Sequence, residues 1–406
     1  MLQRNTYHRT GKGHAMNTIR ERLHAIGTQL KGTFVQRDKA IDCMMLAAIS
    51  GDNFILVGDP GTAKTAVAKA FYAHVSGARA FTMLCGSFQT EDKTFGPVDL
   101  EGLKLGHWRR VIRNRLADCE LAFLDEILKA NDGTLNGMLT ALNERTYDGQ
   151  PIPLRMCGAA TNWPEVNGRS EHVAALWDRF LLRCDVQEVQ GDDARLQLLE
   201  AIDKVASYKP ETTVSMEELE QVRVEFLQVE VPKKVRRTLV SLDKKLRDAK
   251  VEVSARRLGR LQNVMRAAAW LAGRSEVKMD DFDVLEFGLW HDRQQIKTAK
   301  QLVAAIDEEV VNKAIAALRD AAAQCKGGVG ISKDRAPQLV QMIGEAIELA
   351  HQLRAEFGMR ESSEARIKAE FDALRQTYDK IRAMVDSAVE PAKKGKKKDA
   401  NGDQTE

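Results

Sequence analysis

The segment with the clearest chemical potential is a glycine-containing loop between an apolar run and a helical pattern. Its residues are Gly58, Asp59, Pro60, Gly61, Thr62, Ala63, Lys64 and Thr65. A triphosphate needs converging backbone N–H groups, a flexible cation at the β and γ oxygens, and a hydroxyl for Mg²⁺. The loop backbone, Lys64 and Thr65 can supply these groups. The sequence therefore predicts a phosphate-binding loop, whereas the alternative is a chance match in an ordinary loop.

One position departs from the usual pattern of such loops, because Ala63 stands where a glycine normally precedes the lysine. The alanine methyl can be accommodated if this residue is already helical. On that condition the affinity for nucleotide can change, while the chemistry need not.

Polar side chains end two further apolar runs. Asp125 follows the run 121–124 and can hold the Mg²⁺ shell, and Glu126 can polarise an attacking water. The alternative for this pair is a solvated helix start. Asn162 ends a third run, and its amide can fix a water near the γ-phosphate. Taken alone, Asn162 could equally be a turn residue.

The elements that must position these residues alternate between short apolar runs and helical patterns from Met16 to about Val186. This alternation is typical of a parallel α/β sheet. Strands are predicted at 53–57, 120–124, 154–160 and 180–186. After about Gln187 the strand signals disappear, and an all-helical domain is predicted from helical spacing near 192–206, 215–228, 233–249, 255–273 and 280–290.

Two local signals mark helix starts in this second domain. Ser254 is expected to cap the helix at 255–273, and Asp280 and Asp281 to place negative charge at the start of the helix at 280–290.

The C-terminal part of the chain predicts long helices. A stripe at 3.6-residue spacing runs from Leu339 to Phe357, and a coiled-coil seam runs from Ile367 to Val385. We expect a helical hairpin joined near 358–363 and separated from the preceding residues by a glycine-containing break at 325–330. Residues 391–406 are expected to be a disordered polar tail, with a localisation or nucleic-acid signal as the alternative.

Composition narrows the class of protein. The 406 residues include 61 Lys+Arg and 58 Asp+Glu, and 44% are hydrophobic, which indicates a globular chain of two or three domains. A disordered, collagen-like or disulfide-scaffold chain is excluded, and the net charge of +3 gives no global reason to expect nucleic acid. The six scattered cysteines indicate buried thiols in a reducing compartment rather than a zinc site.

Targeting signals are not evident. No apolar run has the length of a membrane span, and the first fifteen residues lack the apolar stretch of a signal peptide. We therefore expect a cytoplasmic protein in which residues 1–15 are a flexible arm or precede a second start at Met16.

Taken together, these features resemble the AAA+ ATPases, and within them the MoxR group and especially RavA-like proteins. The resemblance covers about residues 30–290 and rests on GDPGTAKT (58–65), FGP (95–97), FLDEILKA (123–130), MLTALNER (138–145), ATNWPE (160–165) and WDRF (177–180). An alanine before the lysine is itself typical of that group. With the helical patterns, the resemblance implies an α/β P-loop AAA+ core at 16–188 and an all-helical lid domain at 189–300. The pattern of the remaining residues predicts a helical or coiled-coil extension at 301–390.

The resemblance also implies roles for individual residues. Residues 58–65 would be the Walker A loop that binds ATP, Asp125 and Glu126 would be Walker B, and Asn162 would be sensor 1. Thr65 and Asp125 would hold Mg²⁺. Val35 and Gln36 would line the adenine pocket.

Arginines complete the implied site. Arg179 would be the arginine finger acting on the neighbouring subunit's nucleotide, with Arg183 as the second choice. Arg256 would be the sensor 2 arginine that contacts nucleotide, with Arg257 as its second choice. The alternative for each is a surface ion pair.

Two insertions are consistent with the MoxR pattern. Residues 91–110 would form the loop or hairpin inserted near helix 2, and the Asp148-Gly149 turn predicts a hairpin at 147–151. In related rings such elements face the central pore. Phe95 and Trp108 are therefore candidates for substrate contact, and simple packing is the alternative for both.

The leading functional hypothesis is a ring-forming, hexameric, Mg²⁺-dependent ATPase that remodels or matures a protein complex. By resemblance, its client would carry a von Willebrand factor A domain. One alternative is a nucleic-acid motor or loader, for which the only basic cluster is 107–110 with Arg113 and Arg115. The other is a nucleotide-gated scaffold with little turnover. RavA-like proteins carry an additional β-containing domain where this chain predicts helix only, so the partner of that domain cannot be inferred.

Overall fold

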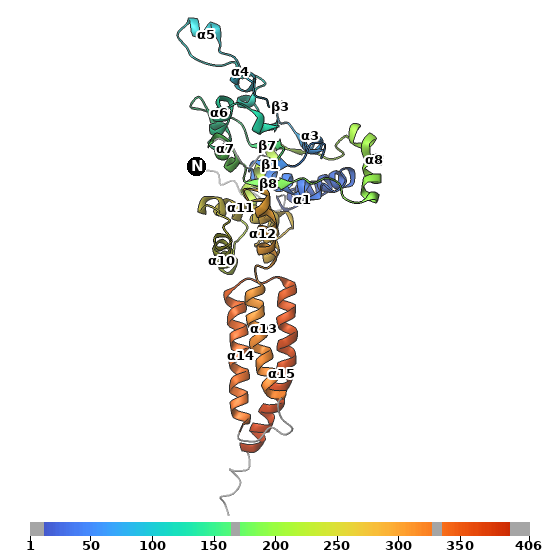
Figure 1. The fold of residues 1–406 in the computed structure, drawn as a ribbon, viewed down its shortest axis with the longest axis vertical. Coiled ribbons are helices and arrows are strands. Elements are labelled where there is room, and N and C mark those ends of the chain that lie inside the picture. The colour runs from blue at the N-terminus through green and yellow to red at the C-terminus, as the bar shows by residue number, and fades with distance from the viewer. Residues whose placement is uncertain (1–11, 164–170, 327–334, 390–406) are drawn as a thin grey trace, which may run out of the picture. The chain divides into compact units, whose positions relative to one another are not determined.

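The computed structural model describes residues 12–163, 171–326 and 335–389 (Figure 1). The chain divides into two compact units. The first comprises the residues up to 231 together with 249–277 and 281–300, and the second comprises 232–248, 278–280 and the residues from 301 onward. The N-terminal residues 1–11 and the predicted tail at 391–406 lie outside the described residues.

A five-stranded parallel sheet forms the centre of the first unit, with the order β3-β4-β7-β1-β8. Its strands are β3 (Ala80–Leu84), β4 (Leu121–Asp125), β7 (Met156–Thr161), β1 (Phe54–Val57) and β8 (Leu182–Asp185). The predicted α/β fold class is confirmed. The edge strand β3 is missing from the sequence prediction, because only Phe81 within it is fully buried and the apolar run is correspondingly weak.

Helices on either side of the sheet supply the rest of the core. They are α1 (Lys12–Thr33), α2 (Asp38–Ser50), α3 (Lys64–Ala73), α6 (Asp132–Asn143) and α7 (Glu171–Arg179) (Figure 1). β1, buried throughout, lies between β7 and β8 in the sheet. Helix α1 begins at Lys12, so the last four residues of the segment predicted as a flexible arm are helical in the structure.

The insertion after β3 contains α4 (Glu91–Phe95), α5 (Leu100–Lys104) and an antiparallel bridge between Val98 and Arg110. Two short 3₁₀ turns, η1 (Leu116–Asp118) and η2 (Ile127–Lys129), flank β4. The predicted hairpin is present as β5 (Thr146–Tyr147) and β6 (Gln150–Pro151). Its turn residues Asp148 and Gly149 have φ values of 47° and 73°, the left-handed pair that a tight two-residue hairpin requires.

Phe95 is not available to a substrate. Its ring is 0% exposed and stacks on Tyr147 with the centroids 4.0 Å apart, so the hairpin covers it. The suggestion that Phe95 contacts substrate is therefore wrong. Trp108 in the same insertion remains 64% exposed.

The segments after β8 are mainly helical, as predicted: α8 (Asp192–Ala206), α9 (Met216–Phe226), α11 (Ala255–Leu271), η3 (Met279–Phe287) and α12 (Arg293–Ala304). Strand β9 (Val214–Ser215) pairs with β2 (Val75–Ser76), so the domain is not entirely helical.

Both expected helix starts are present in the structure. The Ser254 hydroxyl accepts a hydrogen bond from the Arg257 N–H over 3.2 Å, which confirms the predicted cap. Asp280 and Asp281 lie in the first turn of η3, as expected, and Asp281 is in addition buried and paired with Arg274.

Helices make up the described part of the second unit: α10 (Lys233–Asp248), α13 (Glu308–Lys326), α14 (Ala336–Glu356) and α15 (Glu361–Val389). Helices α13, α14 and α15 share one apolar core, so the predicted hairpin is in fact a three-helix bundle. Residues 327–334, which include most of the predicted break, lie outside the described residues. Across the described ranges, no helix combines the length and apolar character needed to span a membrane.

Candidate nucleotide-binding site

The phosphate loop connects the end of β1 at Val57 to the start of α3 at Lys64. Gly58 is required by space, because a Cβ atom there would lie 2.1 Å from the Val186 carbonyl oxygen. Ala63 has φ 62° and ψ 21°, which is left-handed backbone ahead of the helix. The condition that Ala63 be already helical is therefore not met, and its methyl group is carried in a conformation that glycine adopts more easily.

The Lys64 ammonium lies inside this loop. Its Nζ donates to the carbonyl oxygens of Gly58 and Asp59, each over 2.8 Å, and lies 3.5 Å from Asn162 Oδ1. Only 8% of the residue is exposed, and burial lowers its pKa despite the opposing effect of Asp125. The cation is thus held where the loop backbone turns.

The candidate metal ligands meet across the sheet edge. Thr65 Oγ1 donates to Asp125 Oδ2 over 2.7 Å, although Asp125 ends β4 and Thr65 lies in the first turn of α3. A hydroxyl and a carboxylate are hard oxygen ligands of the kind Mg²⁺ takes alongside phosphate and water. The two residues therefore suit a nucleotide-bound Mg²⁺.

Glu126 follows directly in left-handed backbone with φ 51°. Its N–H donates to Asp125 Oδ1 over 3.0 Å, and its carboxylate forms an ion pair with Lys129. Asn162 follows the last residue of β7 beside Lys64. The structure thus brings together the loop, both carboxylates and Asn162 at the carboxyl ends of β1, β4 and β7.

A cavity of about 690 Å³ opens beside the phosphate loop. The cavity is lined by four segments: the end of α1 with the α1–α2 connection, the phosphate loop, the segment after β8, and α8. The lining residues are Thr33, Phe34, Val35, Arg37, Pro60, Gly61, Thr62, Ala63, Glu188, Val189, Arg195, Leu198, Leu199, Ile202, Val205 and Ala206. Its size and mainly apolar lining suit a nucleotide base.

The two residues predicted for the adenine pocket behave differently. Val35 lines the cavity. Gln36 does not line it, and instead its side-chain amide exchanges two hydrogen bonds with the backbone of Gln190. Sequence reasoning missed Arg37 and Arg195, which both line the cavity. Arg37 could have been found because it directly follows Gln36, which was predicted for the pocket. For Arg195, the sequence offers no signal except its position on one face of the helix α8.

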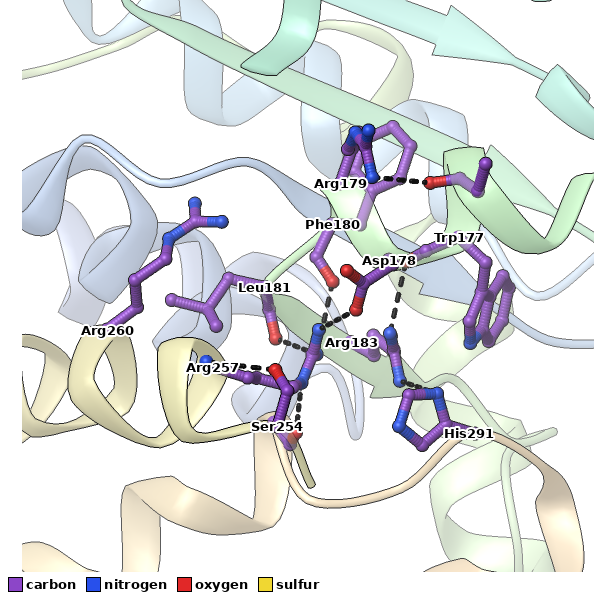
Figure 2. A network of polar contacts seen from close by, with 12 residues as sticks. Trp177, Asp178, Arg179, Phe180, Leu181, Arg183, Ser254, Arg257, Arg260 and His291 are labelled. Carbon is purple, nitrogen blue, oxygen red and sulfur yellow. Dashed lines mark hydrogen bonds and ion pairs between the residues drawn. The ribbon is translucent and has the colours of Figure 1, made fainter. Parts of the chain in front are cut away.

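Arg179 lies at the opposite edge of the sheet. It ends α7, and its carbonyl oxygen accepts a hydrogen bond from Asn53 Nδ2 over 3.3 Å, just before β1 begins. Its Nη1 donates to the Ala175 carbonyl oxygen over 3.4 Å. Figure 2 shows the Arg179 side chain apart from the neighbouring arginine cluster.

The two second-choice arginines are structural. Arg183 is 0% exposed and lies over the Trp177 ring, and it donates to the backbone carbonyl oxygen of Trp290. It also donates to the carbonyl oxygen of Trp177 (Figure 2). It cannot act as a finger, because its guanidinium is enclosed. Arg257 donates to the carbonyl oxygens of Gly288, Phe180 and Leu181. Burial lowers the Arg257 pKa to about 10. It ties α11 to the start of β8 and is not a nucleotide sensor.

Arg256 is exposed, and its Nη2 donates to Asn143 Oδ1 over 3.1 Å. Asn143 ends α6 immediately after Leu142, whose carbonyl oxygen accepts from Asn53 Nδ2. Arg256 therefore shares the amino-end edge of the sheet with Arg179. Within the described residues, the structure does not bring it to the phosphate loop of its own chain.

A P-loop after β1, carboxylates after β4 and a helical segment beyond the sheet define a nucleotide-binding α/β core with a lid. Residues 21–225 match the family described as the MoxR domain in the MoxR-vWA-beta-propeller ternary systems, and residues 234–303 match an AAA lid domain.

Two uncharacterized proteins of Methanocaldococcus jannaschii are similar to the chain. MJ0079 is 30% identical over 309 residues, which span 74% of this chain and 79% of that protein. MJ0812 is 30% identical over 276 residues, which span 66% and 72%. The crystal structure of a candidate ATPase from Cytophaga hutchinsonii shares the fold, with a TM-score of 0.57 and 16% identity over 73% of this chain and 96% of that one.

The family match covers half of the chain, and the relatives are aligned over most of their length. The chain belongs to the MoxR family of AAA+ ATPases.

Proposed function

We propose that this protein is a ring-forming ATPase, RavA-like within the MoxR family, that uses Mg²⁺-ATP hydrolysis to remodel or mature a protein complex in the cytoplasm. One observation carries the proposal: the phosphate loop, Thr65 and Asp125 lie at the carboxyl ends of the strands, whereas Arg179 and Arg256 lie at the amino ends.

Each residue at the carboxyl-end edge has a role in hydrolysis. The loop backbone and Lys64 bind the phosphates, Thr65 and Asp125 hold Mg²⁺, Glu126 polarises the attacking water, and Asn162 orients it. Mg²⁺, when bound, neutralises charge that develops on the β- and γ-phosphate oxygens. Glu126 is held by Lys129 and would have to leave that ion pair to reach a water.

The amino-end arginines cannot complete the site of their own chain. Asn53 beside Arg179 and Gly58 of the loop are joined by β1, which at about 3.3 Å per residue sets them roughly 17 Å apart. We therefore infer that Arg179 and Arg256 face the nucleotide of a neighbouring copy. Such a head-to-tail contact closes into a ring when the rotation allows, and a hexamer is the ring size implied by the family resemblance.

The client is proposed to be a protein with a von Willebrand factor A domain, since the matching family is named for systems with such a component. The exposed side chains of the insertion, Leu100, Leu105 and Trp108, are the proposed contact. A nucleic-acid function is disfavoured, because the basic cluster is largely paired: Arg109 binds Asp99, and Arg110 binds Asp92 and Glu91.

A mixing experiment tests the proposal. Steady-state ATP hydrolysis is measured against protein concentration for the wild type, Glu126→Gln and Arg179→Ala, with sedimentation in parallel. Wild-type activity should rise with assembly, and each variant alone should be inactive.

Mixing the two variants should restore part of the activity, because Glu126→Gln supplies an intact Arg179 to the intact site of Arg179→Ala. Variants that stay inactive in mixed rings would contradict action between subunits. A wild type that assembles but hydrolyses no faster than Glu126→Gln would instead indicate a nucleotide-gated scaffold.

A further inference from the structure

One face of α8 forms a wall of the base cavity. Arg195, Leu198, Leu199 and Ile202 recur at the spacing that aligns side chains along one side of a helix, and all of them line the cavity. Leu199 is 65% exposed and Ile202 is 54% exposed. A flat apolar ring placed in the cavity would cover these side chains, which solvent otherwise reaches.

The direction of α8 determines which of these residues lie toward the phosphate loop. The helix follows closely on β8, whose carboxyl end pairs with the end of β1 just before the phosphate loop. The first turn of α8, with Arg195, therefore starts from the side of the cavity where the loop lies. The last turn approaches Phe34, whose ring lies 5.9 Å from that of Tyr208.

The backbone on either side of α8 is held by glutamine side chains. Gln36 exchanges two hydrogen bonds with Gln190 before the helix, and Gln29 binds Lys209 and Glu211 after it. The wall is therefore positioned before any ligand arrives, which lowers the entropic cost of binding.

Arg195 is an arginine of the cavity lining whose side chain is exposed. Within the described part of the chain its side chain forms no hydrogen bond or ion pair. The other guanidinium in the lining, that of Arg37, is buried and donates to the Gln36 carbonyl oxygen. An exposed arginine that lines the same cavity as the phosphate loop has the charge and the N–H donors to bind phosphate oxygens.

We propose that Arg195 binds the phosphates of the nucleotide within its own chain, while Leu198, Leu199 and Ile202 contact the base. Arg195 thus supplies a cation from the same chain, whereas Arg256 is proposed to face the nucleotide of a neighbouring copy. This inference rests on the proposed function, because it takes the ligand to be an adenine nucleotide.

Calorimetric titration of adenosine, AMP, ADP and Mg²⁺-ATP tests it on the full chain. Arg195→Gln should weaken ATP and ADP binding about tenfold or more and leave adenosine unchanged, since a charge-assisted hydrogen bond is lost. Arg195→Lys should retain part of the affinity. Lys204→Gln, on the same helix but outside the cavity lining, is the matched control and should bind as the wild type does.

The outcomes separate the two proposals. Equal ATP affinity in Arg195→Gln and the wild type would overturn the role of Arg195 and leave the ATPase proposal standing. If Arg195→Gln lost affinity for adenosine and for ATP equally, the proposed contact with phosphate would also be overturned, because Arg195 would then only shape the cavity wall. A wild type that binds none of the four ligands would overturn both proposals.

Discussion

Gln36 and Gln190 exchange two hydrogen bonds: Gln36 Nε2 donates to the Gln190 carbonyl oxygen over 2.9 Å, and the Gln190 N–H donates to Gln36 Oε1 over 2.8 Å. The pair joins the connection before α2 to the residue ahead of α8. Gln36 therefore shapes the base cavity without lining it.

Removal of this pair should weaken nucleotide binding. Gln36→Ala frees the start of α8, and we expect the Kd for ATP to rise about threefold to tenfold, in line with the loss of one or two hydrogen bonds. Gln29→Ala removes two similar bonds at the far end of α8, away from Arg195, and should weaken ATP binding less than Gln36→Ala does. An ATP titration that shows equal effects for both variants would contradict a special role for the Gln36 end.

Ala63 carries left-handed backbone with φ 62°, which costs an alanine roughly 1 kcal/mol more than a glycine. Ala63→Gly should therefore keep or raise the free energy of unfolding by up to about 1 kcal/mol and retain ATP binding. Ala63→Val should lower both, since β-branched residues are strained in this region. Denaturant unfolding and ATP titration measure both effects. A Val variant that is as stable as the wild type and binds ATP would contradict left-handed backbone at residue 63.

Phe95 and Trp108 should respond oppositely to truncation. Phe95→Ala should lower the free energy of unfolding by about 3 kcal/mol, because it empties a buried site against Tyr147. Trp108→Ala should leave folding and basal ATP hydrolysis unchanged and weaken only client binding, because its side chain is 64% exposed. The measurements are urea unfolding and ATP hydrolysis, and a strongly destabilised Trp108 variant would mean that the ring packs against the protein.

His291 should make folding sensitive to acid. Burial, followed by the charges of Arg183 and Arg257, lowers its pKa to about 4 from an ordinary value of 6.5. The unfolded chain therefore binds a proton more readily, and stability falls as pH drops from about 6.5 towards 4, by at most ~1.4 kcal/mol per pH unit.

Urea unfolding at a series of pH values measures this dependence. His291→Gln should flatten the slope between pH 6.5 and 4, whereas the exposed His107→Gln should not. Identical slopes for the wild type and His291→Gln would assign the acid sensitivity to other groups.

The phosphate loop, the carboxylates and Asn162 could be predicted from the sequence, because each is defined by residues that are adjacent in the chain. The loop 58–65, the carboxylates after β4 and Asn162 each follow a strand, and parallel strands bring their carboxyl ends to one edge. The strand β3 was missed, since an edge strand with one fully buried residue leaves little apolar signal. The bundle was underestimated, because two helical stripes do not reveal that α13 covers them both.

The arginines show where sequence alone was insufficient. Arg256 and Arg257 are adjacent, yet a helix rotates successive side chains by about 100°, so one faces solvent and the other is buried. Arg183 resembled a finger by position, but burial against Trp177 excludes that role.

The sequence by itself determined the family, the fold class and the candidate phosphate and metal residues, because these depend on short contiguous patterns. Only the tertiary structure decided that Arg179 and Arg256 share the edge opposite the loop, that Gln36 pairs with Gln190, and that Arg195 lines the base cavity. These relationships join segments far apart in the chain, and they depend on strand direction, helix rotation and burial that no local pattern encodes.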